Sequence, residues 1–287
     1  MASNSPLVSI GMPVYNGERF IRQALDLLLK QDYTNFELII SDNASTDLTQ
    51  QICIEYLKKN SRIKYYRNQV NIGSARNFSK VFSLTRGEYF FWASCHDLWE
   101  PAFISRCVEF LERNPKVVLC YPLADWVDVN GDSLGLIGGN IDTRSLDRLS
   151  RCHVVLWGLQ YAYPIYGVIR TNVLRQARIL RRTIGADAIL LFELSLLGEF
   201  AQVPEVLLHI RQMPDYGSWD NYIEKSFNRQ LRGLSRRMLF WNMLCGYLQA
   251  VGRHIHKIPA KLLLMSSVIF CVLVRYRGIL MRLSESK

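Results

Sequence analysis

The chain has 287 residues, of which 49% are hydrophobic, so it is long enough to bury a large core and too apolar to be intrinsically disordered. Seven cysteines without a Cys-x-x-Cys pair, and a first segment unlike a signal peptide, exclude a disulfide-stapled secreted domain, and we expect a reduced, cytoplasmic protein. The formal net charge of +10 is concentrated in residues 225–287, which carry twelve Lys or Arg against one acid. No nucleic-acid-binding motif accompanies this charge, so we expect no nucleic acid among the partners.

The first hundred residues alternate between short apolar runs and segments with apolar residues at helical spacing. Expected strands cover residues 7–14, 36–42, 63–68 and 88–94, and expected helices cover residues 18–31, 44–59 and 73–87. Ser45 and Thr46 are the predicted N-caps of the second helix. Repeated units of this kind predict an α/β fold with a Rossmann-like, mostly parallel sheet and helices on both faces.

Polar residues follow two of these strands at their carboxyl ends. Asp42 closes the second strand within SDNASTD, and Cys95, His96 and Asp97 follow the fourth. Ligands of parallel α/β sheets bind beyond the carboxyl ends of the strands, so both places are expected at a ligand site. For the Cys-His-Asp cluster the alternatives are metal ligands, a thiol catalyst, an altered nucleotide site, or a turn without chemistry. Asp42 either binds a base or ribose or caps the next helix.

The middle of the chain predicts two further strands and one further candidate carboxylate. Residues 117–135 indicate a strand followed by a loop with an Asn-Gly turn, and residues 161–176 indicate a strand and a short helix. Asp187 follows Gly185 at the start of an apolar helix, where it is either a general base or a carboxylate favoured by the helix dipole. Glu193, among Leu and Phe, is expected to be structural. Five aromatic residues of this region either stack on a bound ligand, which the resemblance named below implies to be a sugar, or pack in the core: Trp126, Trp157, Tyr161, Tyr163 and Tyr166.

Residues 223–287 differ in kind and predict a basic, amphipathic helical tail. Apolar and basic residues alternate at helical spacing up to Pro259, and residues 262–274 form an uninterrupted apolar run. These thirteen residues are too few to span a bilayer, which needs about 20, so the pattern favours a helix lying on an anionic membrane surface. The alternatives are helices packed on the protein's own body or on a second subunit, and a single membrane span over residues 258–280.

Three segments together carry a family resemblance. They are residues 9–50, beginning SIGMPVYNG, residues 71–101, with NIGSARN and WASCHDLWEP, and residues 185–212, beginning GADAILLFEL. Over about residues 7–215 the chain resembles the inverting nucleotide-sugar glycosyltransferases of family two, which have the GT-A fold.

The resemblance also implies a division of the chain. A glycosyltransferase domain is expected at residues 1–222, with a nucleotide-binding part at about 7–100 and an acceptor part at about 101–222. The tail follows at residues 223–287.

The implied activity is transfer of a sugar, of the hexosyltransferase kind, from a nucleoside-diphosphate-sugar to a hydroxyl of a glycan or lipid-linked acceptor. Such a reaction belongs to polysaccharide biosynthesis at the cytoplasmic face of a membrane. An acceptor hydroxyl of high pKa needs a carboxylate base, and the resemblance assigns that role to Asp187. The donor-binding positions that it implies are Pro13, Tyr15, Asn16, Asp42, Arg76, Asp97 and Arg211.

Two departures from the family pattern concern its metal site. At the Asp-x-Asp-Asp segment this chain has Ser94, Cys95, His96 and Asp97, so the first two acids are replaced. His96 and Asp97 are the candidate ligands of a divalent cation, Mn²⁺ or Mg²⁺. Downstream, Met213 stands where the family often has His. These changes leave open a catalytically weak or inactive nucleotide-sugar-binding module of the same fold.

Overall fold

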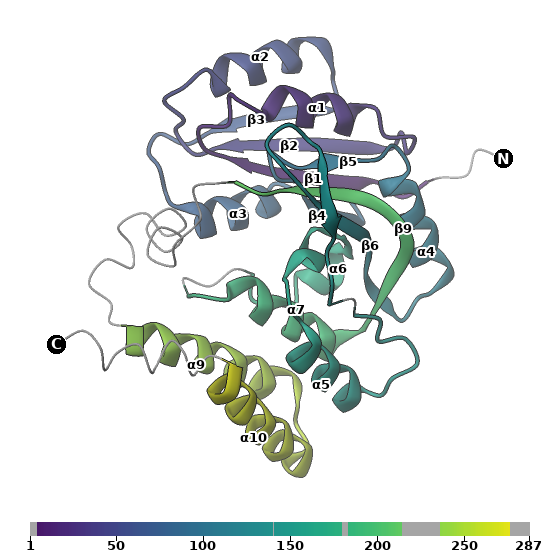
Figure 1. Cartoon of the computed structure of the whole chain (residues 1–287), viewed down its shortest axis with the longest axis vertical. Helices are drawn as coiled ribbons and strands as arrows, with labels where there is room; N and C mark the ends of the chain where they lie inside the picture. The colour runs from purple at the N-terminus through teal and green to yellow at the C-terminus, as the bar shows by residue number, and fades with distance from the viewer. Residues whose placement is uncertain (1–4, 140, 180–182, 214–235, 276–287) are drawn as a thin grey trace.

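The computed structural model describes residues 5–139, 141–179, 183–213 and 236–275 (Figure 1). Its first half is a parallel βα assembly. The strands are β1 (Val8–Val14), β2 (Phe36–Asp42), β3 (Ile63–Arg67) and β4 (Tyr89–Trp92), in the spatial order β3-β2-β1-β4. The helices between them are α1 (Ile21–Leu29), α2 (Thr49–Lys59) and α3 (Ser74–Ser83). The predicted strands and helices of this half are confirmed, with ends that differ by a few residues.

The second half extends the same sheet with strands of mixed direction. The strands are β5 (Leu98–Trp99), β6 (Val117–Val127), β7 (Ser133–Leu136), β8 (Val168–Arg170) and β9 (Glu199–Arg211). β8 runs antiparallel to β4, β9 runs parallel to β6, and β5 lies at the edge beside β9. The described chain thus forms one nine-stranded sheet, which confirms the α/β fold class.

Further helices lie around this second half. They are α4 (Phe103–Arg113), α5 (Arg148–Gly158), the 3-10 helix η1 (Tyr163–Tyr166), α6 (Thr171–Leu174) and α7 (Ala186–Leu197). The tail contributes α9 (Arg236–His254) and α10 (Ile258–Arg275). In Figure 1, α5, α7, α9 and α10 gather at the end of the molecule away from α1 and α2.

Two local predictions need correction. The second helix begins at Thr49, and neither Ser45 nor Thr46 caps it, because the Ser45 hydroxyl accepts a hydrogen bond from the Asn16 N–H instead. The loop expected after β6 contains a strand, β7, which pairs back onto β6 across the Asn-Gly turn at 130–131. Gly131 has φ +100° there, a left-handed conformation that glycine adopts without steric cost.

The core explains why these segments fold together. β1 and β2 bury nearly every side chain, as strands covered on both faces do. Phe90 and Trp92 of β4 meet edge to face, with ring centroids 4.7 Å apart, beneath α3. α7 is apolar around most of its circumference and is buried between β6, α5 and α9. The sheet therefore presents its β1, β2 and β4 carboxyl ends on a rigid base.

Candidate functional site

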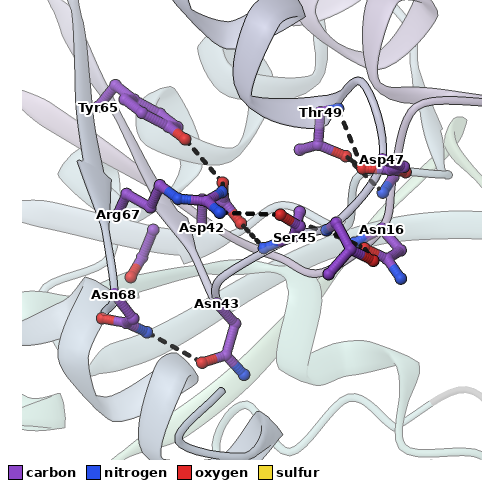
Figure 2. Close-up of polar contacts among 12 residues, drawn as sticks. Asn16, Asp42, Asn43, Ser45, Asp47, Thr49, Tyr65, Arg67 and Asn68 are labelled. Atoms are coloured by element: carbon purple, nitrogen blue, oxygen red, sulfur yellow. Dashed lines mark hydrogen bonds and ion pairs between the residues drawn. The ribbon is translucent and has the colours of Figure 1, made fainter. Parts of the chain in front are cut away.

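Asp42 lies at the carboxyl end of β2, fully buried, and its carboxylate is held by three donors. Oδ1 accepts the Ser45 N–H at 2.8 Å, and Oδ2 accepts the Tyr65 hydroxyl at 2.6 Å and Arg67 Nη1 at 2.7 Å. Arg67 Nη2 also donates to the Ser45 carbonyl at 2.9 Å. Figure 2 shows Asp42 at the centre of this group, with Tyr65 and Arg67 reaching it from β3. The negative charge of the Asp42 carboxylate is thus balanced by the Arg67 guanidinium, and the hydrogen bonds of Asp42 to Tyr65 and Arg67 hold the ends of β2 and β3 together.

The loop after β1 lies against the same strand end. Val14 pairs with Asp42 in the sheet register, so Tyr15 and Asn16 begin the loop directly beside it. Asn16 has φ +51°, and its side-chain oxygen accepts the Thr46 N–H at 2.8 Å. The Tyr15 ring is half exposed, whereas Pro13 is still within β1. The predicted residues Pro13, Tyr15, Asn16 and Asp42 are therefore brought together.

A network of buried asparagines fixes the next part of this edge. Asn77, on α3, accepts the Ser41 hydroxyl and donates to the Ser41 carbonyl, both at 2.7 Å. Asn68 donates to Asn77 at 3.1 Å and to Asn43 at 2.9 Å. Arg76, the predicted donor-binding residue beside Asn77, is exposed on α3.

Sequence reasoning missed this asparagine network. The only sign of it was that Asn recurs where a strand or loop ends, and that signal is weak because Asn is common in turns. The network docks α3 onto the end of β2 and thereby sets where Arg76 emerges.

The Cys-His-Asp cluster follows β4, and its three residues have different surroundings. The His96 ring is one-third exposed, and its Nδ1 lies 3.1 Å from the Ser94 hydroxyl. Cys95 packs against the β1 loop, where a Cβ added to Gly17 would come within 3.1 Å of the Cys95 sulfur. Burial raises the pKa of the Cys95 thiol to about 12, which disfavours the reactive thiolate. The cluster thus adjoins the Asp42 group without offering a thiol nucleophile.

Asp97 is buried rather than presented to solvent. Its Oδ1 accepts the Arg211 backbone N–H at 3.0 Å and lies 3.8 Å from His96 Nε2. Burial raises the pKa of Asp97, opposed by the charges of His96 and Arg211. Asp97 therefore connects the loop after β4 to the end of β9.

Arg211 completes this connection with its side chain. Nε donates to the His96 carbonyl at 2.9 Å, Nη1 to the carbonyls of Asp128 and Val129, and Nη2 to Gln23 Oε1 at 2.9 Å. The guanidinium also lies 4.5 Å from the centre of the Phe20 ring. These contacts place Arg211 as a buried clamp between α1, β9 and the Cys-His-Asp loop, rather than as a side chain extended toward solvent.

The residues of this edge do not fit a divalent cation held by the protein alone. Within the described ranges there is no group of three or more His, Cys, Asp or Glu arranged to hold a metal. Of the two predicted ligands, Asp97 is almost fully buried, with Oδ1 already accepting the Arg211 N–H, and the His96 ring is the more exposed. Met213 is a poor ligand for a hard ion. Both ring nitrogens of His209, two residues before Arg211, already have carboxylate partners: Nδ1 lies 2.5 Å from Asp125 and Nε2 lies 3.1 Å from Glu100.

Asp187 comes from the second half, in the first turn of α7. Gly185, at the N-cap, has φ +65°, which a residue with a side chain adopts only with strain. Burial raises the pKa of Asp187 from 3.8 to about 6. A carboxylate with a pKa close to neutral can accept a proton in the transition state and release it afterwards, as a general base must.

Glu193, one and a half turns further along α7, is fully buried and binds the tail. Its Oε1 accepts Arg253 Nη2 at 2.5 Å and Arg253 Nε at 3.0 Å, and lies 2.9 Å from His254 Nε2. The expectation that Glu193 is structural therefore has a physical basis, because α7 and α9 share a buried ion pair. The helix that carries Asp187 is fixed to the C-terminal helices.

Comparison with known proteins identifies the family of the chain. The sequence model of the family described as glycosyl transferase family 2 matches residues 9–152, which is half of the chain. An uncharacterized glycosyltransferase of Haemophilus influenzae is 27% identical over 216 residues, which cover 72% of this chain and 66% of that protein. An uncharacterized glycosyltransferase of Rickettsia typhi is 37% identical over 131 residues, covering 45% of this chain and 40% of that protein. The chain thus spans two fifths to two thirds of the length of these relatives.

Solved structures share the fold at low sequence identity. The crystal structure of Staphylococcus aureus TarS residues 1–349 in complex with UDP-GlcNAc matches 94% of this chain and 73% of that chain, with a TM-score of 0.68 and 16% identity. The mannosyltransferase PcManGT of Pyrobaculum calidifontis, in complex with GDP-Man and Mn²⁺, matches 96% of this chain and 83% of that chain, with a TM-score of 0.56 and 16% identity. The described residues have the GT-A fold of these enzymes, and the chain belongs to glycosyl transferase family 2.

Proposed function

We propose that this protein is an inverting glycosyltransferase that moves a hexose from a nucleoside-diphosphate-sugar to a hydroxyl of a glycan or lipid-linked acceptor. Family membership and fold support nucleotide-sugar transfer. The observation that carries the mechanism is Asp187, a carboxylate at the start of a buried helix with its pKa raised to about 6. A group of this pKa suits proton removal from an acceptor hydroxyl near neutral pH.

The donor is proposed to bind at the edge formed by the β1 loop and the ends of β2 and β4. Tyr15 offers a half-exposed ring for a base, and Arg76 offers an exposed guanidinium for a phosphate. Asp42 would receive a base N–H or ribose hydroxyl only by giving up one of its present donors, so its role there includes rearrangement of Arg67 or Tyr65. Asp97 and Arg211 position the loop that carries His96.

The proposed displacement is a single step in which the sugar forms no covalent bond to the enzyme. The acceptor oxygen attacks C1 of the donor sugar from the face opposite the diphosphate and forms the new C1–O bond. The bond between C1 and the diphosphate oxygen breaks, and its electron pair leaves with the nucleoside diphosphate. The acceptor proton passes to the Asp187 carboxylate, which releases it to solvent. Attack from the opposite face inverts the configuration at C1.

The cluster does not fit a metal, so the leaving diphosphate is proposed to be stabilised by protein cations. Arg76, which is exposed on α3, and Arg67, which is partly exposed and contacts Asp42 at 2.7 Å, are cations at the donor edge as we propose it. Positive groups fixed near a developing negative charge lower the barrier for its departure. A divalent ion carried in by the donor diphosphate would add Lewis-acid charge at the same place.

A second candidate function is a nucleotide-sugar-binding module with little or no turnover. The observation that favours it is that Ser94 and His96 stand where the family resemblance implies carboxylates, and that Asp97 is buried and accepts a backbone N–H.

One experiment separates the two functions. A panel of nucleoside diphosphates and their sugars is screened by thermal shift, since a ligand that binds only the folded state raises Tm. The donor that gives the largest shift is then incubated with and without Mn²⁺, and release of nucleoside diphosphate and transfer to added glycan acceptors are measured. Turnover in either condition supports the enzyme. A clear thermal shift with no release of diphosphate in both conditions supports the binding module.

The cytoplasmic placement is proposed from the cysteines. All seven are free thiols, including Cys107 and Cys120, which are buried in hydrogen-bond contact with each other. Thiols so placed persist unoxidised in a reducing compartment.

A further inference from the structure

α10 has two faces, and one of them is an exposed apolar surface. Four residues, Leu264, Val268, Cys271 and Val272, are buried against the protein. The opposite half of the helix carries Ile258, Leu262, Leu263, Ile269, Phe270, Leu273 and Val274, each between 40% and 70% exposed. We call these seven residues the α10 face. Exposing this many large apolar side chains on one helix is costly in water, so the α10 face is expected to have a partner.

The α10 face extends onto α5 through an aromatic contact. Trp157 is 40% exposed, and its ring centroid lies 5.9 Å from that of Phe270. An exposed Trp beside an exposed Phe on an apolar surface is typical of a segment at the boundary between lipid tails and headgroups. The surface therefore includes more than one helix.

The buried side of α10 is bonded to the body of the protein at both ends. Near its start, Lys261 Nζ donates to the Gly252 carbonyl at 3.4 Å. Near its end, Arg275 Nη1 and the Cys271 thiol donate to the Leu156 carbonyl at 2.8 and 3.3 Å. α9, which precedes it, is held by the Glu193 ion pair. These contacts orient the α10 face outward.

The charged residues of α9, α10 and the segment between them have one sign. Residues 236–275 contain six Lys or Arg and no Asp or Glu. Lys257 is exposed just before the helix, and Arg275 at its end is also exposed. A partner that covers the face must accept apolar side chains and offer negative charge beside them.

We propose that the α10 face docks into the surface of a bilayer that contains anionic lipid. Its apolar side chains and Trp157 enter the boundary between headgroups and acyl chains, and the exposed Lys257 lies among the headgroup phosphates. This inference does not depend on the proposed function, because the face would bind lipid whether or not the donor edge turns over.

Two other occupants account less well for these observations. α10 is long and apolar enough to cross a membrane by length and composition, but crossing would break its contacts to Leu156 and Gly252 and expose Leu264 and Val268 to lipid without their present partners. A second copy of the chain would bring the same basic residues together at a symmetric interface, where like charges repel. The bilayer satisfies both the apolar and the charged requirement.

The test is flotation of the full chain with vesicles. Parent protein is mixed with vesicles of phosphatidylcholine alone and with vesicles containing about one third phosphatidylglycerol, at about 0.05 M and about 0.5 M salt. We expect binding to anionic vesicles that weakens severalfold at high salt because the charge component is screened. We expect Leu263→Glu/Phe270→Glu to lower the vesicle partition coefficient by roughly tenfold or more, since it puts two charges into the apolar face.

A matched control uses two other exposed apolar residues. Leu134→Glu/Leu136→Glu, on β7, adds the same two charges to a surface away from α10 and should leave vesicle binding at the parental level. Circular dichroism and Tm of both variants should match the parent, because all four residues are exposed.

Three results would overturn the proposal. They are absence of binding to anionic vesicles at low salt, equal binding by the parent and by Leu263→Glu/Phe270→Glu, and retention of the cellular protein in membranes after an alkaline carbonate wash, which indicates a span. A dimer that becomes a monomer in Leu263→Glu/Phe270→Glu, measured by light scattering without vesicles, would assign the face to a second copy instead.

Discussion

The residue with the clearest chemical prediction is Asp187. If it is the base, Asp187→Asn should lower the transfer rate by roughly 10²–10⁴ and leave donor affinity near the parental value, because the amide keeps the shape and loses the basicity. The parent's rate at saturating donor should rise with pH and level off above about 6, where the carboxylate is ionised. Transfer assays and calorimetry with the donor check both parts. Parental transfer by Asp187→Asn would place the base elsewhere.

The same residue makes a prediction about stability. Folding raises the pKa of Asp187 from 3.8 to about 6, so between these values the folded state binds more protons than the unfolded state and loses stability as pH rises. Asp187→Asn removes this cost. The variant should be more stable than the parent by about 1–3 kcal/mol at pH 8, and the difference should shrink toward zero below about pH 4. Denaturant titrations at the two pH values measure it.

For Asp97 the structure changes the expected experiment. As a metal ligand, Asp97 would be needed for stabilisation by Mn²⁺, whereas in the fold its carboxylate accepts the Arg211 N–H. Asp97→Ala leaves that buried donor without its acceptor, and a cost of about 1–3 kcal/mol is expected. The drop in Tm should be the same with Mn²⁺ and with chelator. A drop confined to the Mn²⁺ condition would restore the metal-ligand interpretation.

At the scale of elements, α3 offers two neighbouring residues with opposite expectations. Asn77 is buried and bonds Ser41 and Asn68, so Asn77→Ala should destabilise the protein by about 2–4 kcal/mol through two or more lost buried hydrogen bonds. Arg76 is exposed beside it, so Arg76→Ala should leave Tm within about a degree of the parent and weaken donor binding. Thermal melts and donor calorimetry on both variants test the pair. Unaltered donor binding by Arg76→Ala would remove Arg76 from the donor edge. A clearly lower Tm would contradict its expected lack of a structural role.

Elements set by local pattern were predictable from sequence, and those set by distant partners were not. β2 was predicted at its observed ends because FELIISD is apolar and bounded by turn residues. The start of α2 was missed because Ser45 and Asp47 bond to the loop after β1, about thirty residues earlier in the chain. The sequence of β7 was interpreted as a loop because all four residues of this strand are exposed and it has no buried face.

The candidate site divides in the same way. Asp42 and the cluster after β4 were found because both follow strands at one edge of a parallel sheet. The roles of Asp97 and Arg211 were not, because they meet across more than a hundred residues and their contact depends on β9 running beside β5 and β6. The apolar and basic pattern of the tail indicated helices correctly, but which face of α10 packs inward is decided by α5 and α9.

At the scale of the whole molecule, the Glu193 ion pair joins the domain to its C-terminal helices. Arg253→Ala leaves Glu193 fully buried without its main cation, and a loss of about 3–5 kcal/mol is expected, as for other broken buried pairs. Glu193→Leu/Arg253→Met, which removes both charges, should recover much of that loss. Denaturant titrations of the two variants give the comparison. Equal loss in both would contradict this account, because the double variant has no buried carboxylate left without its cation and Met keeps an aliphatic stem in place of Arg253.

This ion pair also has a geometric consequence that follows if the proposed docking of α10 holds. Glu193 and Asp187 lie on one rigid helix, and Glu193 is bonded to the helix that leads into α10. If α10 lies in the bilayer surface, Asp187 works at one fixed height above the lipid. The protein would then select acceptors by length. An acceptor chain whose reacting end lies at that height would be extended, and the end of a longer chain would lie out of reach of Asp187.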